Sequence, residues 1–129
     1  MREQPAVTLV QLRPPRGRRA WTIRHNGHRY AVFEVDGKLE VTDAACPHFG
    51  GPLARGVVRD GVVTCPWHWY SFELASGRCL TAGRFQLRKY PVISRDGNSY
   101  AELPGELRRS RWRRLLGMPA RPRRRGASR

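Results

Sequence analysis

The sequence predicts an all-β protein, and two observations carry this prediction. Short segments of strand character recur along the chain, and four dipeptides separate them: Asn26-Gly27, Asp36-Gly37, Asp60-Gly61 and Asp96-Gly97. These dipeptides suit two-residue type I′ turns, because both central residues of such a turn need positive φ. We therefore expect small packed antiparallel sheets or a barrel-like body.

The expected strands flank these turns and carry the alternating or β-branched residues typical of strands. They are expected over residues 6–12, 21–24, 30–35, 38–42, 57–58, 62–64, 85–90, 92–93 and 100–103. Segment 21–24 leads into the first turn and 30–35 leaves it. Segment 38–42 alternates polar and apolar residues after the second turn. Segments 57–58 and 62–64 lie on either side of the third turn. Segments 85–90, 92–93 and 100–103 lie around the fourth turn.

Length and composition indicate one domain followed by a tail. The 129 residues suffice for one modest core. No run approaches the roughly 20 apolar residues of a membrane span, and the first residues lack the apolar stretch of a secretory signal. We place the domain at residues 1–104 and a basic, arginine-rich tail at 105–129, and we expect the protein in the cytoplasm.

The formal charge of +15 is concentrated in the tail, where residues 105–129 hold ten arginines against a single acid, Glu106. The pattern permits a short basic helix over 106–116, and the composition beyond it predicts disorder. Three interpretations stay open for the tail: a solvated segment, a contact for an acidic partner, or a patch for anionic membrane or nucleic acid. Nothing in the tail resembles a base-reading motif.

Two Cys/His pairs are the most informative residues of the domain. Sixteen residues separate the first pair, Cys46 and His48, from the second pair, Cys65 and His68. Both pairs lie in loops marked by proline or glycine after predicted strands. Cys-x-His followed by Cys-x2-His is the ligand pattern of a Rieske [2Fe-2S] cluster, in which two cysteines hold one iron and two histidines the other. The pairs therefore predict an electron-transfer site.

Zinc is the alternative for four nitrogen and sulfur ligands. Zinc fingers usually pair Cys with Cys at one end and His with His at the other. Here each loop supplies one of each, which favours a binuclear cluster that both loops share. The third cysteine, Cys79, is expected to be a small, partly buried apolar residue after a turn, with a redox-active or ligand thiol as the alternative. Three cysteines exclude a full disulfide framework.

The chain resembles the Rieske ferredoxin-like family through both loops. Its CPHFGGPLARG is similar to the family's first loop, and CPWHWYSFELASG to its second loop, which an aromatic residue, a strand and a glycine-bearing turn follow. The resemblance covers about residues 5–103 and is to bacterial Rieske ferredoxins and nitrite-reductase small-subunit-like proteins. It implies three small antiparallel sheets with two cluster-binding loops near one tip. It also implies that the cluster histidines lie near the surface and form the electron exit.

Departures from the respiratory Rieske pattern refine this resemblance. Gly51 and Trp67 stand where respiratory Rieske proteins carry two bridging cysteines. Tyr70 and Phe72 stand where that group has a Ser and a Tyr that donate hydrogen bonds to the cluster sulfurs and cysteine. Because Phe72 cannot donate, we predict a midpoint potential of about −150 mV, at the low end of the Rieske range.

Aromatic residues crowd the second loop, with Trp67, Trp69 and Tyr70 around His68. They are expected to cover the cluster and pack in the loop, or alternatively to form a docking patch for a redox partner. His25 and His28 flank the first turn and are expected to be surface residues, with a second metal site as the alternative.

These observations predict a one-electron carrier without a catalytic site of its own. The expected partners are a reductase and a terminal oxygenase or other oxidoreductase, with acidic docking surfaces as an option. The alternatives are a non-catalytic small subunit of a larger reductase, or a cluster-bearing module whose tail contacts nucleic acid or membrane. An oxygenase activity would need a mononuclear iron site with two histidines and a carboxylate, and residues 1–104 leave no room for that second domain.

Overall fold

The computed structural model describes residues 6–48, 50–67 and 69–105, and within them it contains strands and one short 3-10 helix but no α-helix. The elements are β1 (Val7–Leu12), β2 (Ala20–His25), β3 (His28–Val35), β4 (Lys38–Asp43), η1 (Leu53–Arg55), β5 (Val57–Arg59), β6 (Val62–Thr64), β7 (Ser71–Glu73), β8 (Lys89–Tyr90), β9 (Val92–Arg95) and β10 (Asn98–Pro104). The predicted tail lies outside the described residues, apart from Gly105. In the described part of the chain, no helix has the length and apolar character needed to cross a membrane.

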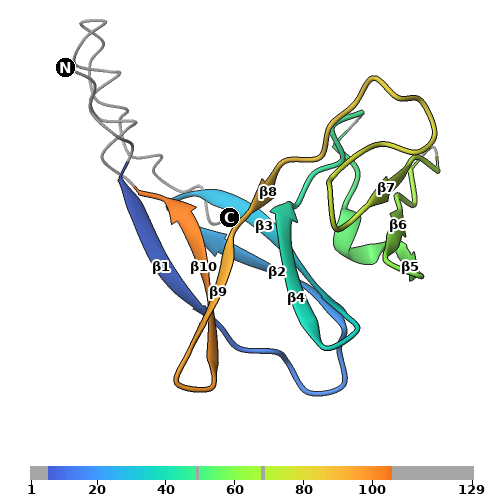
Figure 1. Cartoon of the computed structure of the whole chain (residues 1–129). Coiled ribbons are helices and arrows are strands. Elements are labelled where there is room, and N and C mark those ends of the chain that lie inside the picture. Colours follow the sequence, from blue (N-terminus) through green and yellow to red (C-terminus); the bar gives the residue numbers. More distant parts are fainter. Residues whose placement is uncertain (1–5, 49, 68, 106–129) are drawn as a thin grey trace, which may run out of the picture.

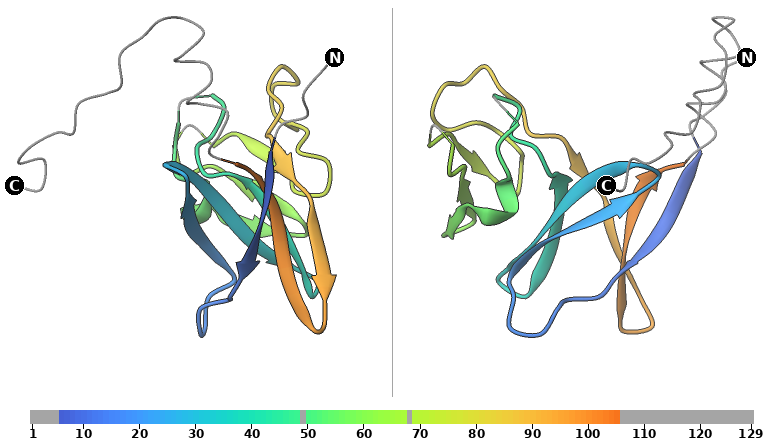
Figure 2. Two further views of the ribbon diagram at one scale, coloured as in Figure 1. Left: turned by 90° about the vertical axis from the view of Figure 1, so that its left-hand side faces the viewer. Right: turned by 180° about the vertical axis from the view of Figure 1, so that it is seen from behind.

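The strands form three antiparallel sheets, which confirms the predicted fold class. Their orders are β1-β10-β9, β2-β3-β4-β8 and β5-β6-β7. In Figure 1 the first two sheets face each other, and the small β5-β6-β7 sheet stands to one side with the long loops around it. The view from behind in Figure 2 shows the same separation.

The four predicted turns all occur as two-residue connections. Asn26, Asp36, Asp60 and Asp96 have φ of 51°, 50°, 52° and 54°, and the glycine after each also has positive φ. The strand pairs close directly on these turns, with His25 opposite His28 in the first hairpin and Arg95 opposite Asn98 in the last. The turn chemistry therefore sets the register of four of the hairpins.

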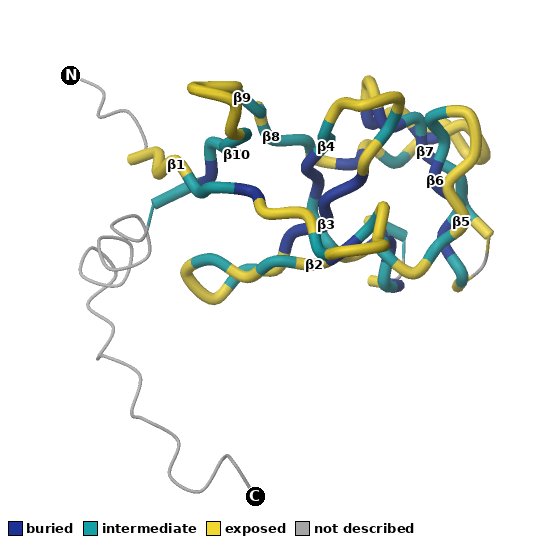
Figure 3. Tube along the Cα trace, turned by 90° about the horizontal axis from the view of Figure 1, so that it is seen from below, coloured by how far each residue is buried: buried dark blue, intermediate teal, exposed yellow. Residues whose placement is uncertain are grey.

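Strand β3 is buried on both faces, because the central sheet separates two cores. Tyr30 and Val32 pack in one core with residues of β1, β2, β4 and β10, whereas Ala31 and Phe33 face the other core. Successive side chains of a strand point to opposite faces, so this alternation follows from the pleat. In Figure 3 the buried segments run through β3 and β4 in the middle of the molecule.

The second core contains the residues of the small sheet and of the loops near it. Phe72, Leu74 and Leu87 are fully or almost fully buried there, with Phe33 from the central sheet. The predicted strand over 85–90 is wrong in its first part, since only Lys89–Tyr90 forms a strand. Leu87 explains the difference. Its side chain is buried, and its backbone N–H donates to the carbonyl of Gly77, which lies in a loop and not in a strand.

Candidate functional site

The first ligand loop follows β4 and folds back on itself. The N–H of Cys46 donates to the carbonyl of Gly51 at 2.9 Å, and the N–H of Gly50 donates to the carbonyl of Cys46 at 2.7 Å. Gly50 has φ of 78°, a left-handed conformation that glycine adopts without steric cost. These bonds hold Cys46 at the base of a tight loop.

The second ligand loop connects β6 to β7 and closes in a similar way. The N–H of Cys65 donates to the carbonyl of Tyr70 at 2.7 Å. Strand pairing continues directly beyond it, with Thr64 opposite Ser71, and the two hydroxyls lie 3.0 Å apart. Cys65 is therefore fixed at the end of a hairpin, which limits the movement of its thiol.

The two loops bring Cys46 and Cys65 together in the second core. The cysteines are 3% and 0% exposed, and their thiols are close enough to share a hydrogen bond. Burial raises the pKa of the Cys65 thiol, a hydrogen bond from the backbone of Trp67 lowers this pKa, and the nearby Cys46 raises it. Burial thus disfavours the thiolate of Cys65, and a bound cation would offset that cost.

Gly51 provides the space beside these thiols. A Cβ atom at this position would lie 2.6 Å from Sγ of Cys65 and 3.0 Å from Cβ of Trp67. Positions 51 and 67 are thus neighbours, as expected for the places that hold bridging cysteines in respiratory Rieske proteins. This chain has no disulfide there, and its three cysteines are free thiols.

His48 lies in an aromatic stack above the first loop. Its ring stacks on Tyr70 with centroids 4.0 Å apart and planes inclined by 13°, and Phe85 approaches edge-on at 5.4 Å. Phe85 also meets Tyr70 edge-on at 5.5 Å. The Nδ1 atom of His48 is shielded from solvent, although the residue is only half-buried. The stack fixes the plane of the imidazole.

The structure thus brings the predicted ligands Cys46 and Cys65 together and places His48 in the same loop as Cys46. The fourth predicted ligand, His68, lies outside the described residues. Within the described part of the chain, no three cysteine, histidine or acidic side chains gather closely enough to hold a single metal ion. A binuclear cluster does not require such a group, because each of its irons takes only two protein ligands. The paired thiols and the separate imidazole of His48 fit that division.

The remaining cysteine and histidines take structural positions. Cys79 is 4% exposed and its sulfur accepts the backbone N–H of Ala82 at 3.5 Å, which confirms the prediction of a buried residue. His25 lies 3.2 Å from the amide of Asn26. His28 is half-buried and its Nε2 atom lies 2.9 Å from Oδ1 of Asp43, an ion-pair geometry that the prediction of a surface histidine missed.

The prediction that the loop aromatics pack in the loop is confirmed for Tyr70 and is wrong for Trp67 and Trp69. Tyr70 is half-buried against His48. Trp67 and Trp69 are instead 51% and 66% exposed. Neither tryptophan belongs to the second core, which Phe72, Leu53 and the cysteines help to form.

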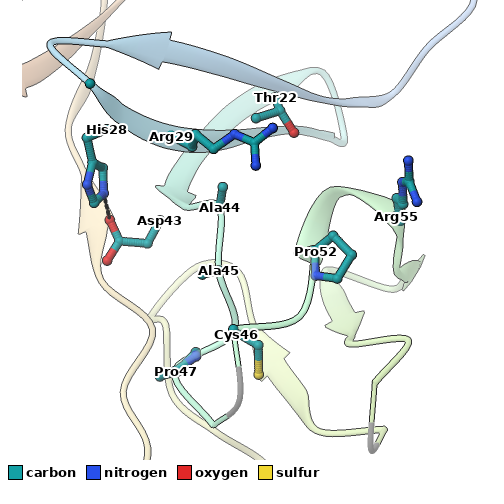
Figure 4. Close-up of a pocket in the computed structure, with 12 residues that line it drawn as sticks. Thr22, His28, Arg29, Asp43, Ala44, Ala45, Cys46, Pro47, Pro52 and Arg55 are labelled. Atoms are coloured by element: carbon teal, nitrogen blue, oxygen red, sulfur yellow. Dashed lines mark hydrogen bonds and ion pairs between the residues drawn. The ribbon is translucent and has the colours of Figure 1, made fainter. Parts of the chain in front are cut away.

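A groove of about 560 Å³ runs beside the first loop, as Figure 4 shows. Cys46 and Pro47 line one part of it, and the guanidinium groups of Arg29 and Arg55 reach toward it from two different elements. The Asp43 carboxylate at its inner side also accepts a 2.6 Å hydrogen bond from the Tyr90 hydroxyl. Asp43 escaped the sequence analysis, although a carboxylate at the end of a strand directly before a ligand loop was a signal for it.

The fold and the site define a small all-β protein in which two loops carry two buried thiols and an imidazole. The chain matches the Rieske [2Fe-2S] domain family over residues 7–91, and it belongs to that family. This membership confirms the predicted Rieske-type [2Fe-2S] cofactor, and the paired buried thiols beside Gly51 fit such a cluster.

Three similar proteins place the chain within the family. The 3-phenylpropionate/cinnamic acid dioxygenase ferredoxin subunit of Photorhabdus laumondii is 37% identical over 79 residues, which cover 59% of this chain and 74% of the relative. The Sphingomonas yanoikuyae B1 ferredoxin has 26% identity and a TM-score of 0.63, and the match covers 78% of this chain and 100% of that structure. A protein described as an NADPH nitrite reductase small subunit has 25% identity and a TM-score of 0.61, with 72% and 93% covered.

Proposed function

We propose that the chain is a Rieske-type ferredoxin, a non-catalytic one-electron carrier. The observation that carries this proposal is the meeting of Cys46 and Cys65, buried and in contact, at the base of two loops that also hold His48. In our assignment, Cys46 and Cys65 hold the inner iron, and His48 and His68 hold the outer one. The bound cluster takes up and releases one electron at a time.

The chain's own residues prepare the site for that role. Burial of both thiols excludes water, and the backbone N–H of Trp67 donates to the Cys65 sulfur, which stabilises negative charge there. Tyr70 holds the His48 ring by stacking. With the loops rigid on their hairpins, the change in charge is accommodated with little movement, as electron transfer requires.

The proposed carrier passes electrons from a reductase to a terminal oxygenase or another oxidoreductase. Support comes from the 37% identity to a dioxygenase ferredoxin subunit, most of whose length the match covers. The alternative is a small subunit bound to a larger reductase, which the similarity to the nitrite reductase small subunit favours. The third hypothesis, a module whose tail binds nucleic acid or membrane, depends on residues 106–129, which lie outside the described residues.

We also propose a cytoplasmic location. The three cysteines are free thiols, and no disulfide stabilises the two loops at positions 51 and 67. This arrangement suits a reducing compartment, in which thiols persist.

Spectroscopy of the purified protein tests the proposal. The expected protein is coloured, carries two irons per chain and takes up one electron per cluster in a reductive titration. Its reduced state should give the electron paramagnetic resonance spectrum of mixed cysteine and histidine ligation. A colourless, zinc-loaded protein would contradict the proposal. Stoichiometric co-purification of a large reductase subunit would instead support the alternative role.

A further inference from the structure

Trp69 has a backbone conformation that tryptophan rarely adopts. Its φ is 61°, in the left-handed region. The other described non-glycine residues with positive φ are Asn26, Asp36, Asp60 and Asp96. Asn and Asp tolerate this region because their short polar side chains hydrogen-bond locally. A bulky side chain lacks that compensation, so the conformation of Trp69 costs free energy.

The indole ring of Trp69 does not recover this cost by packing. It is 66% exposed, which makes Trp69 the most exposed large hydrophobic residue of the described chain. Burying an aromatic ring would stabilise the fold, and leaving it in water forfeits most of that gain. The fold therefore keeps a residue at this position that is both strained and exposed. Such positions are concentrated at functional sites.

Other apolar side chains are exposed on the loops around Trp69. Trp67, in the same loop, is 51% exposed, and Leu80 is 46% exposed. The Leu80 segment lies against the second ligand loop, because the N–H of Leu80 donates to the carbonyl of Ser71 at 2.8 Å. We call Trp67, Trp69 and Leu80 the apolar patch. Scattered exposed apolar residues need no explanation, but a group of this kind marks an interaction surface.

The loops that carry this apolar patch are basic. Segments 65–72 and 79–85, which carry the patch, contain Arg84 and no aspartate or glutamate, and the first ligand loop over 44–56 adds Arg55 and also has no acidic residue. This charge repels a second copy of the chain and attracts an acidic surface. Exposed tryptophans on loops that also carry arginine match the composition of protein interfaces, in which both residues are enriched.

We propose that the apolar patch docks the redox partner and that Trp69 is its anchor. The partner surface complementary to it is an apolar hollow with carboxylates on its rim. The left-handed backbone presents the indole ring outward for this contact. The tryptophan at position 69 therefore serves binding and does not stabilise the fold. The inference rests on the proposed carrier function and identifies the surface through which the carrier acts.

Three variants of the cluster-loaded full chain test this inference. Trp69→Gly removes both the ring and the strain, whereas Trp69→Ala removes the ring and keeps a Cβ at positive φ. Asp96→Gly is the matched control, because it changes another positive-φ residue in the β9–β10 turn, on a sheet that lacks the ligand loops. The acceptor is the oxygenase component of the 3-phenylpropionate dioxygenase of Photorhabdus laumondii, reduced under single-turnover conditions, and ferricyanide is the small-molecule acceptor.

We expect both Trp69 variants to lower the second-order rate with the oxygenase by tenfold or more, equal to at least 1.4 kcal/mol. Their visible spectra and ferricyanide rates should match the wild type. Trp69→Gly should also melt at a higher temperature than wild type, whereas Trp69→Ala should not. Unchanged oxygenase rates, an equal loss with ferricyanide, or a lower melting temperature for Trp69→Gly would each overturn the inference. A wild-type chain that fails to reduce the oxygenase would contradict the proposed function instead.

Discussion

The substitution Gly51→Ala tests directly whether the two thiols form the cluster site. The added Cβ would lie 2.6 Å from Sγ of Cys65 and 3.0 Å from Cβ of Trp67. Non-bonded carbon atoms have their optimal separation at about 3.5–4.0 Å, and sulfur is larger, so the contact is about 1 Å too short. Cys65 is 0% exposed, so its thiol has no free space to retreat into.

The cost of this substitution follows from overpacking. Forcing one extra methyl group into a packed interior typically costs about 1–3 kcal/mol. The φ of Gly51 lies outside the left-handed region, so alanine adds no backbone strain and restricts the unfolded chain, a gain of about 0.4–1 kcal/mol. The net loss of stability is therefore between about 0 and about 2.6 kcal/mol, centred near about 1.3 kcal/mol. The larger effect is on cofactor binding, because relief of the clash displaces a ligand sulfur.

Iron content, visible absorption and urea unfolding of Gly51→Ala measure both effects. We expect a folded protein that purifies with less than half of the wild-type iron. Gly50→Ala is the matched control: it has nothing within 4 Å of the added Cβ but a φ of 78°, so it costs stability through the backbone and leaves the thiols in place. Gly51→Ala with full iron content and wild-type stability would refute the assignment of this space to the cluster loops.

Three further predictions concern the ligands, the potential and the dependence on pH. Cys65→Ser should abolish the cluster absorption, whereas Cys79→Ser should retain it, and equal loss in both would contradict the ligand assignment. Because Phe72 is buried in the core and donates no hydrogen bond, a redox titration should give a midpoint near −150 mV, and a value well above zero would sink that argument. Burial and the hydrogen bond to Asp43 raise the pKa of Tyr90. The folded state thus favours the neutral phenol of Tyr90. The free energy of unfolding should therefore be constant up to about pH 10 and fall as the pH rises further. Urea unfolding at a series of pH values should show this decline in the wild type and a weaker decline in Tyr90→Phe.

The sequence predicted best what local chemistry decides. The four Asn-Gly and Asp-Gly turns occur as expected, because a two-residue turn requires positive φ at both positions and these residues tolerate it. The ligand loops were predictable for a related reason. Gly56 follows the first loop, where a Cβ would lie 2.2 Å from the carbonyl oxygen of Thr64. Where a close backbone contact permits only glycine, the glycine becomes part of the sequence motif, and the motif can be recognised without the structure.

Features set by distant packing could not be predicted. The segment before β8 has strand character in the sequence. In the structure, however, the side chain of Leu87 is buried in the second core, and its backbone N–H donates to the carbonyl of Gly77. The exposure of Trp69 was equally hidden, because an aromatic residue in a cluster loop suits either a cover or a docking surface. The φ and the 66% exposure of Trp69 depend on the folded backbone, and they favour the docking surface that we propose.

The division of the molecule into two cores connects folding with cofactor binding. The core between the two larger sheets contains no cysteine, and its residues come from strands of six to eight residues together with β10. The other core includes all three cysteines, and its β5–β7 sheet has strands of only three residues each. So short a sheet buries too little apolar surface to be stable by itself. The proposed ligands Cys46 and Cys65 are part of the packing that holds this sheet, so we expect the free energy of cluster binding to stabilise it. The body made by the two larger sheets has its own core and supports the ligand loops through β3, whose Ala31 and Phe33 face the cysteines.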